Sequence, residues 1–129
     1  MLKLTCPGVP DIYQGDELEA LALVDPDNRR PVDWELRRRL LGSDPGPRPE
    51  KLFVTARLLD LRRRRPDAFS SGYMPVRARH DVCAFMRGAS VLVVVPVSPD
   101  ARPEIEVAGS WRDVLEERFP FRVLEAAQP

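Results

Sequence analysis

"SVLVVVPV" (Ser90–Val97) is the stretch of sequence that decides the fold of this 129-residue chain. Its five central residues, Val91 to Val95, are all apolar, and four of them are β-branched valines that favour a strand. Polar residues do not alternate with the apolar ones, so both faces of this strand should be covered by other elements. We therefore predict that Val91–Val95 is the core strand of a sheet, with the preceding helix as the candidate cover for one face.

The segments around this strand also favour β structure. "YMPVRARHDVCAFMRG" (Tyr73–Gly88) is typical of a hairpin whose tip lies at His80 and Asp81. "EIEV" (104–107), "SWRDVLEE" (110–117) and "FRVLE" (121–125) are interpreted as shorter strands or edges separated by turns. The C-terminal half is therefore predicted to be an antiparallel sheet.

A helix is predicted directly before the sheet, over "EKLFVTARLLDLRRRR" (50–65). Pro49 suits its first turn, Pro66 ends it, and its apolar stripe contains Leu52, Ala56 and Leu59, with Val54, Leu58 and Leu61 beside them. The four arginines at residues 62–65 could form a phosphate-binding patch. Cations at a helix C-terminus also oppose the helix dipole, so we favour a solvated helix end.

Seven prolines limit the first 49 residues to short regular elements. One short helix fits there, with Asp33 as its cap, Trp34 to Leu41 as its body and Gly42 at its end. The following "GSDPGPRP" (42–49) is typical of a turn-rich linker.

Composition excludes several classes of function. Twenty basic and twenty acidic residues give no net charge, which disfavours nucleic acid and anionic membrane surfaces as partners. Cys6 and Cys83 lack the spacing of a metal site, and His80 is expected in a solvent-exposed turn, so neither a metal nor a catalytic histidine is predicted. No glycine-rich nucleotide loop, signal peptide or membrane span is recognised, and we expect a cytoplasmic protein without a cofactor.

A polar and aromatic cluster on irregular backbone is the candidate site. It comprises Tyr13, Gln14, Asp16 and Glu17, followed by "VDPDNRRPVDW" (24–34). Aromatic rings together with amide, carboxylate and guanidinium groups are suited to holding sugar rings and hydroxyls. The alternative is that the acidic residues and Asn28 only shape turns and that Asp33 only caps a helix, and composition alone favours this alternative.

The same residues carry a family resemblance. "PGVPDIYQGDEL" (7–18) and "LVDPDNRRPVDW" (23–34) strongly resemble the C-terminal region of maltooligosyltrehalose synthase, in the α-amylase superfamily (glycoside hydrolase family 13). "LLDLRRRRPDAF" (58–69) and "SVLVVVPVS" (90–98) look like the last barrel helix of such an enzyme and its all-β C-terminal domain.

The resemblance implies an α+β fold that keeps part of a (β/α)8 barrel. Residues 1–47 would be a remnant of barrel strand eight with its loop and a short helix, 48–66 the last barrel helix, and 67–129 an antiparallel β domain. The eighth strand would be "LTCPGVPDIYQG" (4–15), whose C-terminal end faces the active site of such barrels. The first seven strands are missing, so we expect a fragment whose exposed N-terminal strand could self-associate.

The implied parent enzyme converts the reducing-end α-1,4 link of a malto-oligosaccharide into an α,α-1,1 (trehalose) link by intramolecular transglucosylation. Its catalytic carboxylates lie on earlier strands, so no catalytic residue is assigned here, the chain alone should be inactive, and Glu17 is expected to be structural. Trp34 is expected to pack. The residues expected to contact sugar in the intact enzyme are Tyr13, Gln14, Asn28, Arg29 and Arg30. Two alternatives stay open, a stand-alone carbohydrate-binding module and a structural interaction β domain.

Overall fold

The computed structural model describes residues 1–19, 21, 29–42 and 49–127. The chain divides into two compact units. One unit, here the sheet unit, combines Met1–Gly8 with Arg57–Pro129, and the other, here the loop unit, is Val9–Ala56.

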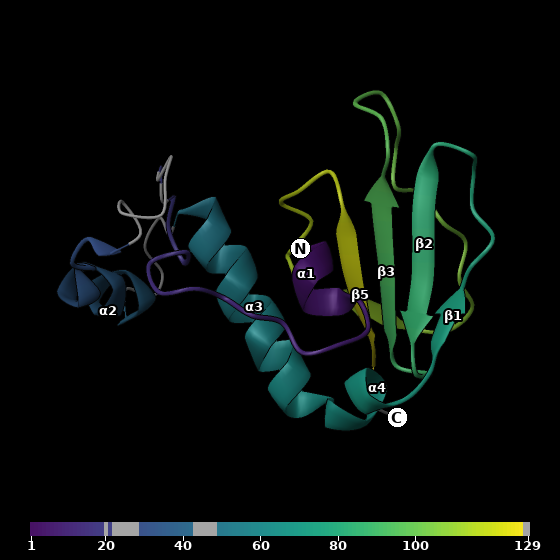
Figure 1. Cartoon of the computed structure of the whole chain (residues 1–129). Coiled ribbons are helices and arrows are strands. Elements are labelled where there is room, and N and C mark those ends of the chain that lie inside the picture. Colours follow the sequence, from purple (N-terminus) through teal and green to yellow (C-terminus); the bar gives the residue numbers. More distant parts are fainter. Residues whose placement is uncertain (20, 22–28, 43–48, 128–129) are drawn as a thin grey trace. The chain divides into compact units, whose positions relative to one another are not determined.

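The sheet unit is a small α+β unit built on a five-stranded antiparallel sheet (Figure 1). Its strands lie in the order β1-β2-β3-β5-β4. Their bounds are β1 Tyr73–Pro75, β2 Val82–Arg87, β3 Val91–Pro96, β4 Trp111–Asp113 and β5 Arg122–Ala126. The predicted hairpin is confirmed, because β1 pairs with β2 and the backbone N–H of Val82 donates to the carbonyl of Arg79 (3.0 Å) across the turn.

Strand β3 is the core of the sheet, as its sequence predicts. Val91, Leu92, Val93 and Val94 are all fully buried. One face of the sheet presents Leu92 and Val94 to an apolar cluster, completed by Val82, Ala84, Ala101 and Leu124. The opposite face carries Val91 and Val93 with their buried cross-strand neighbours Phe85 and Val123.

Residues 104–107 cover part of the first face without joining the ladder. The strand expected at "EIEV" is wrong, because this segment has no regular structure. Its alternation has another cause: Ile105 and Val107 pack against the apolar cluster while the two glutamates between and before them are exposed. The alternation of apolar and polar residues therefore indicates an extended segment with one buried side. It does not by itself predict that the segment pairs with a strand.

Helices α1 (Leu2–Thr5), α3 (Glu50–Arg64) and α4 (Pro66–Ser70) precede the sheet in the chain. The predicted helix is confirmed as α3, although Leu59 is 44% exposed while Leu58 and Leu61 are fully buried. Two of these helices are tied to the second face of the sheet by Arg87, which is 2% exposed. Its guanidinium donates to the carbonyls of Thr5 (3.3 Å) and Phe69 (2.6 Å).

The strand expected over residues 4–15 is wrong, because Leu2–Thr5 forms one helical turn and residues 6–13 have no regular structure. A strand satisfies its backbone only through a neighbouring strand, whereas a helical turn does so locally. The N–H of Leu4 donates to Met1 O (3.0 Å) and that of Cys6 to Leu2 O (2.8 Å). The expected strand edges are therefore not present at residues 2–5, and self-association stays a prediction.

The loop unit contains α2 (Trp34–Gly42) and the first turns of α3. The predicted cap is confirmed, because Asp33 Oδ1 accepts a hydrogen bond from the N–H of Leu36 (2.8 Å). None of the α2 side chains is buried. In contrast, Leu52, Phe53 and Val54 of α3 are all buried.

Candidate functional site

The loop unit presents two of the predicted sugar-contacting residues, Tyr13 and Gln14, on a tight turn, Tyr13–Leu18. Asp16 N–H donates to Tyr13 O (3.0 Å), and Leu18 N–H donates to Gly15 O (3.3 Å). Gly15 has a φ of +94°, a conformation that favours glycine. A Cβ on Gly15 would stand 3.4 Å from Val32 Cγ2, which is an ordinary contact, so the backbone conformation rather than space favours glycine here.

One arginine that the sequence analysis did not select, Arg37 on α2, braces this turn. Its guanidinium donates to Gly15 O (2.7 Å), to Glu17 Oε2 (3.2 Å) and to Asp33 O (3.0 Å). It also lies 5.9 Å from the ring centroid of Trp34. Three acceptors on two separate segments fix the position of the turn better than one surface ion pair could, because the side chain has a single arrangement that reaches them all.

The interpretation of Glu17 as structural agrees with this geometry. Its carboxylate is committed to Arg37, and the two side chains are 27% and 13% exposed. A second brace comes from Lys51, whose Nζ donates to Leu18 O (3.0 Å). Trp34, which we expected to pack, is 45% exposed and contacts the Arg37 cation.

The predicted site residues are placed as follows. Tyr13 is 49% exposed and Gln14 is also exposed, so both side chains are open to a ligand from the same turn. Arg29 and Arg30 are exposed and lead into Val32, which lies against that turn. Asn28 lies outside the described residues. Of the four described residues, the sequence neighbours Tyr13 and Gln14 lie on the turn, and Arg29 and Arg30 lie on a separate segment.

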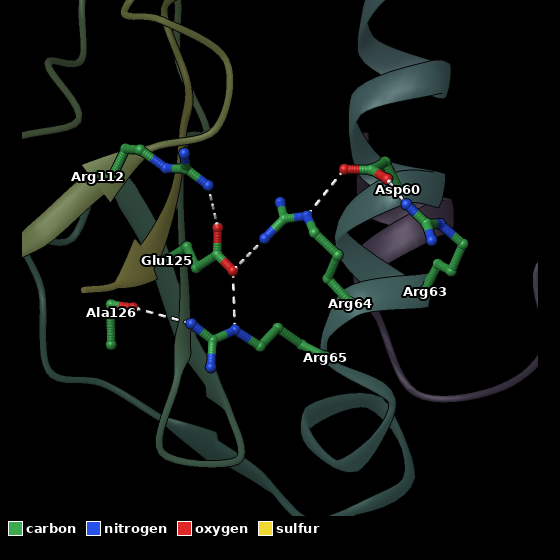
Figure 2. A network of polar contacts seen from close by, with 7 residues as sticks. All are labelled: Asp60, Arg63, Arg64, Arg65, Arg112, Glu125 and Ala126. Carbon is green, nitrogen blue, oxygen red and sulfur yellow. Dashed lines mark hydrogen bonds and ion pairs between the residues drawn. The ribbon is translucent and has the colours of Figure 1, made fainter. Parts of the chain in front are cut away.

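The sheet unit holds a second polar cluster, centred on Glu125 of β5 (Figure 2). The Glu125 side chain is 3% exposed. Its Oε1 accepts hydrogen bonds from Arg64 Nη1 and from Arg65 Nε (2.8 Å), and its Oε2 accepts one from Arg112 Nη2 (2.7 Å). Arg65 Nη2 also donates to Ala126 O (3.2 Å).

These contacts change the acidity of the Glu125 carboxyl. Burial alone would raise its pKa, but the hydrogen bonds from Arg65, Arg64 and Arg112 outweigh burial and lower the pKa from 4.5 to about 2. The carboxylate is therefore ionised at every pH at which proteins are usually handled. A carboxyl held in this state cannot donate a proton as a general acid.

The solvated helix end predicted for residues 62–65 holds for the exposed Arg63 and Arg64 and is wrong for Arg62 and Arg65, which are half-buried. Arg64 and Arg65 bind Glu125, which lies about sixty residues away in the sequence. Arg62 donates to Leu4 O (3.1 Å) and lies 4.5 Å from the ring centroid of Phe69. Arg63, at 77% exposed, binds only the neighbouring Asp60 among the described residues. Buried acceptors on distant elements, rather than the helix dipole, determine where these cations lie.

The other chemical features carry no site. Within the described ranges, no group of three or more histidine, cysteine or acidic side chains could hold a metal ion. His80 is exposed at the hairpin turn, as predicted. The described part of the chain has no helix that is both long and apolar enough to cross a membrane.

Comparison with known proteins links the chain to one enzyme. A Mycobacterium tuberculosis protein, found in strains CDC 1551 and H37Rv and provisionally named a maltooligosyl trehalose synthase, is 50% identical over 100 residues. The match covers 74% of this chain and 13% of that protein. No family model matches the chain.

Two solved structures are similar along almost the whole chain. The crystal structure of a hypothetical maltooligosyl trehalose synthase from Sulfolobus tokodaii has a TM-score of 0.71 and 34% identity, and the match covers 96% of this chain and 19% of that one. A second maltooligosyl trehalose synthase structure has a TM-score of 0.75 and 26% identity, with 94% and 20% covered. The chain is thus homologous, by sequence and by structure, to a region that makes up about an eighth to a fifth of these proteins.

Proposed function

We propose that this chain is the C-terminal part of a maltooligosyl trehalose synthase and that its turn Tyr13–Leu18 contributes to the sugar-binding surface of that enzyme. The observation that carries the proposal is the 50% identity over 100 residues to a relative with that name. The reaction would convert a reducing-end α-1,4 link into an α,α-1,1 link. The segments 1–47, 48–66 and 67–129 would then derive from the end of a barrel, its last helix and a β domain.

The exposed groups on the turn are chemically suited to a sugar. Tyr13 offers an aromatic ring and a hydroxyl, and Gln14 offers an amide that both donates and accepts hydrogen bonds. Arg37 holds the turn in place through hydrogen bonds to Gly15 O and Glu17, so the turn needs little rearrangement when a ligand binds. Arg29 and Arg30, and Asn28 beyond the described residues, would add further hydrogen-bond donors.

The acids of this segment are poor candidates for catalysis. Retaining glycosyl transfer uses two carboxyl groups about 5 Å apart, one as nucleophile and one as acid. Glu125 is ionised among three arginines and cannot supply a proton, and the Glu17 carboxylate is already bound by Arg37. The catalytic carboxylates would therefore come from outside this segment, and the isolated chain would not turn over substrate.

Two assays test the proposal on the purified chain. With maltopentaose as substrate, we expect no nonreducing product with a trehalose end. If the chain does turn over maltopentaose and Glu17→Gln abolishes that turnover, the structural role of Glu17 is contradicted. Glu19→Gln is the control, because Glu19 is an exposed acid two residues away.

The second assay measures binding by nuclear magnetic resonance during titration with maltopentaose. We expect shifts confined to residues 13–18 and 29–32, and we expect Tyr13→Ala to weaken them at least threefold. Tyr73→Ala is the matched control, since Tyr73 is the other tyrosine and is 46% exposed. Shifts that follow Tyr73 or Trp111 instead would favour a carbohydrate-binding β domain, and a chain without any shifts but with stable oligomers would favour an interaction domain.

A further inference from the structure

The arginines around Glu125 exceed the number that its charge requires. Arg63 and Arg64 bind Asp60, and Arg64, Arg65 and Arg112 bind Glu125, so these four arginines and two carboxylates form one connected network (Figure 2). Two positive charges are therefore left over locally, in a chain whose net charge is zero. Clustered like charges repel one another, so such an excess favours the binding of an anion.

The hydrogen-bond donors of these side chains are also incompletely used. A guanidinium group has five N–H donors and no acceptor. Among the described residues, Arg112 uses one donor, on Glu125, and its side chain is 68% exposed. Arg65 uses its Nε and Nη2 on Glu125 and Ala126 O.

An open cavity adjoins these donors. It has a volume of about 310 Å³ and is lined by Arg64, Arg65, Arg112, Glu125, Ala126 and Ala127. A second cavity of about 290 Å³ shares Arg64 and Arg112 with the first. The bonds to Glu125 hold Arg64, Arg65 and Arg112 in position, so their remaining donors are arranged before any ligand arrives.

We propose that the surface formed by Arg64, Arg65 and Arg112 is a binding site for a phosphate group, either as the free ion or as the monoester of a small molecule. Phosphate carries about 1.5 to 2 negative charges at neutral pH, and the charged residues that line the cavity are three arginines and one carboxylate. Its several oxygens can accept hydrogen bonds from more than one planar guanidinium at once. The site lies in the sheet unit and is independent of the sugar-binding role proposed for the turn.

The test is a titration of the full chain with inorganic phosphate at constant ionic strength, using sodium chloride as the balancing salt. The arginine side-chain N–H resonances report binding directly. We expect saturable shifts at Arg64, Arg65 and Arg112 and none at Arg79, whose paired side chain lies at the hairpin. An absence of saturable shifts overturns the proposal.

Two variants with the same change in charge show whether phosphate binds at a defined site or is attracted by the positive charge of the region in general. Arg112→Gln removes a lining donor and should weaken phosphate binding about tenfold, the loss expected for one charged hydrogen bond. Arg63→Gln removes an arginine that binds only Asp60 among the described residues and does not line the cavity, so we expect less than a twofold change. Equal weakening by both variants overturns the proposal. If Arg112→Gln fails to fold, Arg112→Lys keeps the charge, and a loss of at least threefold is still expected because the planar fork is gone.

Glycerol 3-phosphate distinguishes the two sources of the phosphate group. Binding at least as tight as that of inorganic phosphate supports a monoester ligand, and binding tenfold weaker supports the free ion. The remaining experiment tests whether chloride competes with phosphate for the site. Chloride that displaces phosphate at equal concentration would show that the three arginines recognise charge alone, which contradicts a phosphate site.

Discussion

Arginine stabilises both units of this protein, but it does so in two different ways. In the loop unit, the single side chain of Arg37 binds two backbone carbonyls and one carboxylate, Glu17. In the sheet unit, three arginines converge on one carboxylate, Glu125, which is 3% exposed. The first arrangement fixes a turn near the surface, and the second neutralises a charge inside a packed face.

The difference shows how burial sets the importance of an ion pair. A carboxylate removed from water carries a large desolvation cost, so its partners must be numerous and well oriented. A partly exposed pair gains little, and its contribution is largely geometric. Changes in the sheet unit should therefore alter global stability, whereas changes in the loop unit should alter local order.

The largest effect is expected from Val93→Asp in β3. Val93 is fully buried on the face shared with Phe85 and Val123. An unpaired charge there costs several kcal/mol, about as much as the whole stability of a small domain. We expect the sheet unit to lose its cooperative thermal transition, measured by circular dichroism.

Val97→Asp is the matched control for this substitution. Val97 follows β3 directly and is 63% exposed, so the same change in charge should shift the melting temperature by only a few degrees. A Val93→Asp variant that melts like Val97→Asp would show that β3 is not the core strand.

An intermediate effect is expected at Glu125. Its pKa falls from 4.5 to about 2 on folding, which corresponds to about 3 kcal/mol of stability at neutral pH. Because the folded-state pKa is the lower one, this stability is present above pH 4.5 and is lost as the pH falls toward 2. Denaturant titrations across this range should show the decline.

Glu125→Gln should lower the free energy of unfolding at pH 7 by about 3 kcal/mol and flatten its dependence on pH between 4.5 and 2. Glu117→Gln is the control, since Glu117 also binds an arginine, Arg122, but its side chain is 73% exposed. If the two variants are equally stable at pH 7, burial does not decide the strength of these pairs and the comparison between the units fails.

The smallest effect is expected from Arg37→Gln in the loop unit. The free energy of unfolding should change by about 1 kcal/mol, while the amides of Asp16 and Leu18 should exchange with solvent roughly tenfold faster. Hydrogen exchange followed by nuclear magnetic resonance measures both amides. Arg38→Gln, which removes an exposed partner of Glu35, should leave the two exchange rates unchanged. Unchanged exchange in Arg37→Gln would show that Arg37 is not the brace of the turn.

The elements that could be predicted are those whose cause is local. The apolar run of Val91–Val95 predicted the core strand, and the spacing of apolar residues predicted a helix over residues 50–65, of which 50–64 are helical. Asp33 could be identified as a cap because it binds an N–H only three residues away.

The candidate sites were predictable only in part. Arg37 was missed because it stands in a run of three arginines on a helix without buried residues, and periodicity does not distinguish it from its neighbours. Glu125 did leave a signal. It lies two residues after Val123 on the same face of a strand, and an acid at an inward-facing position requires a cationic partner.

The sequence by itself determined the antiparallel sheet, the long helix and the homology, because apolar periodicity and short motifs depend on residues that are close together in the chain. Tertiary structure alone decided that residues 2–5 form a helical turn rather than a strand, since a strand requires a neighbour to pair with. It also decided that Arg64 and Arg65 bind Glu125. The positions of these arginines depend on which distant hydrogen-bond acceptors the fold brings within about 3 Å of their N–H groups. A buried carboxylate needs such partners because its desolvation is costly, and this need outweighs the local preference of the helix.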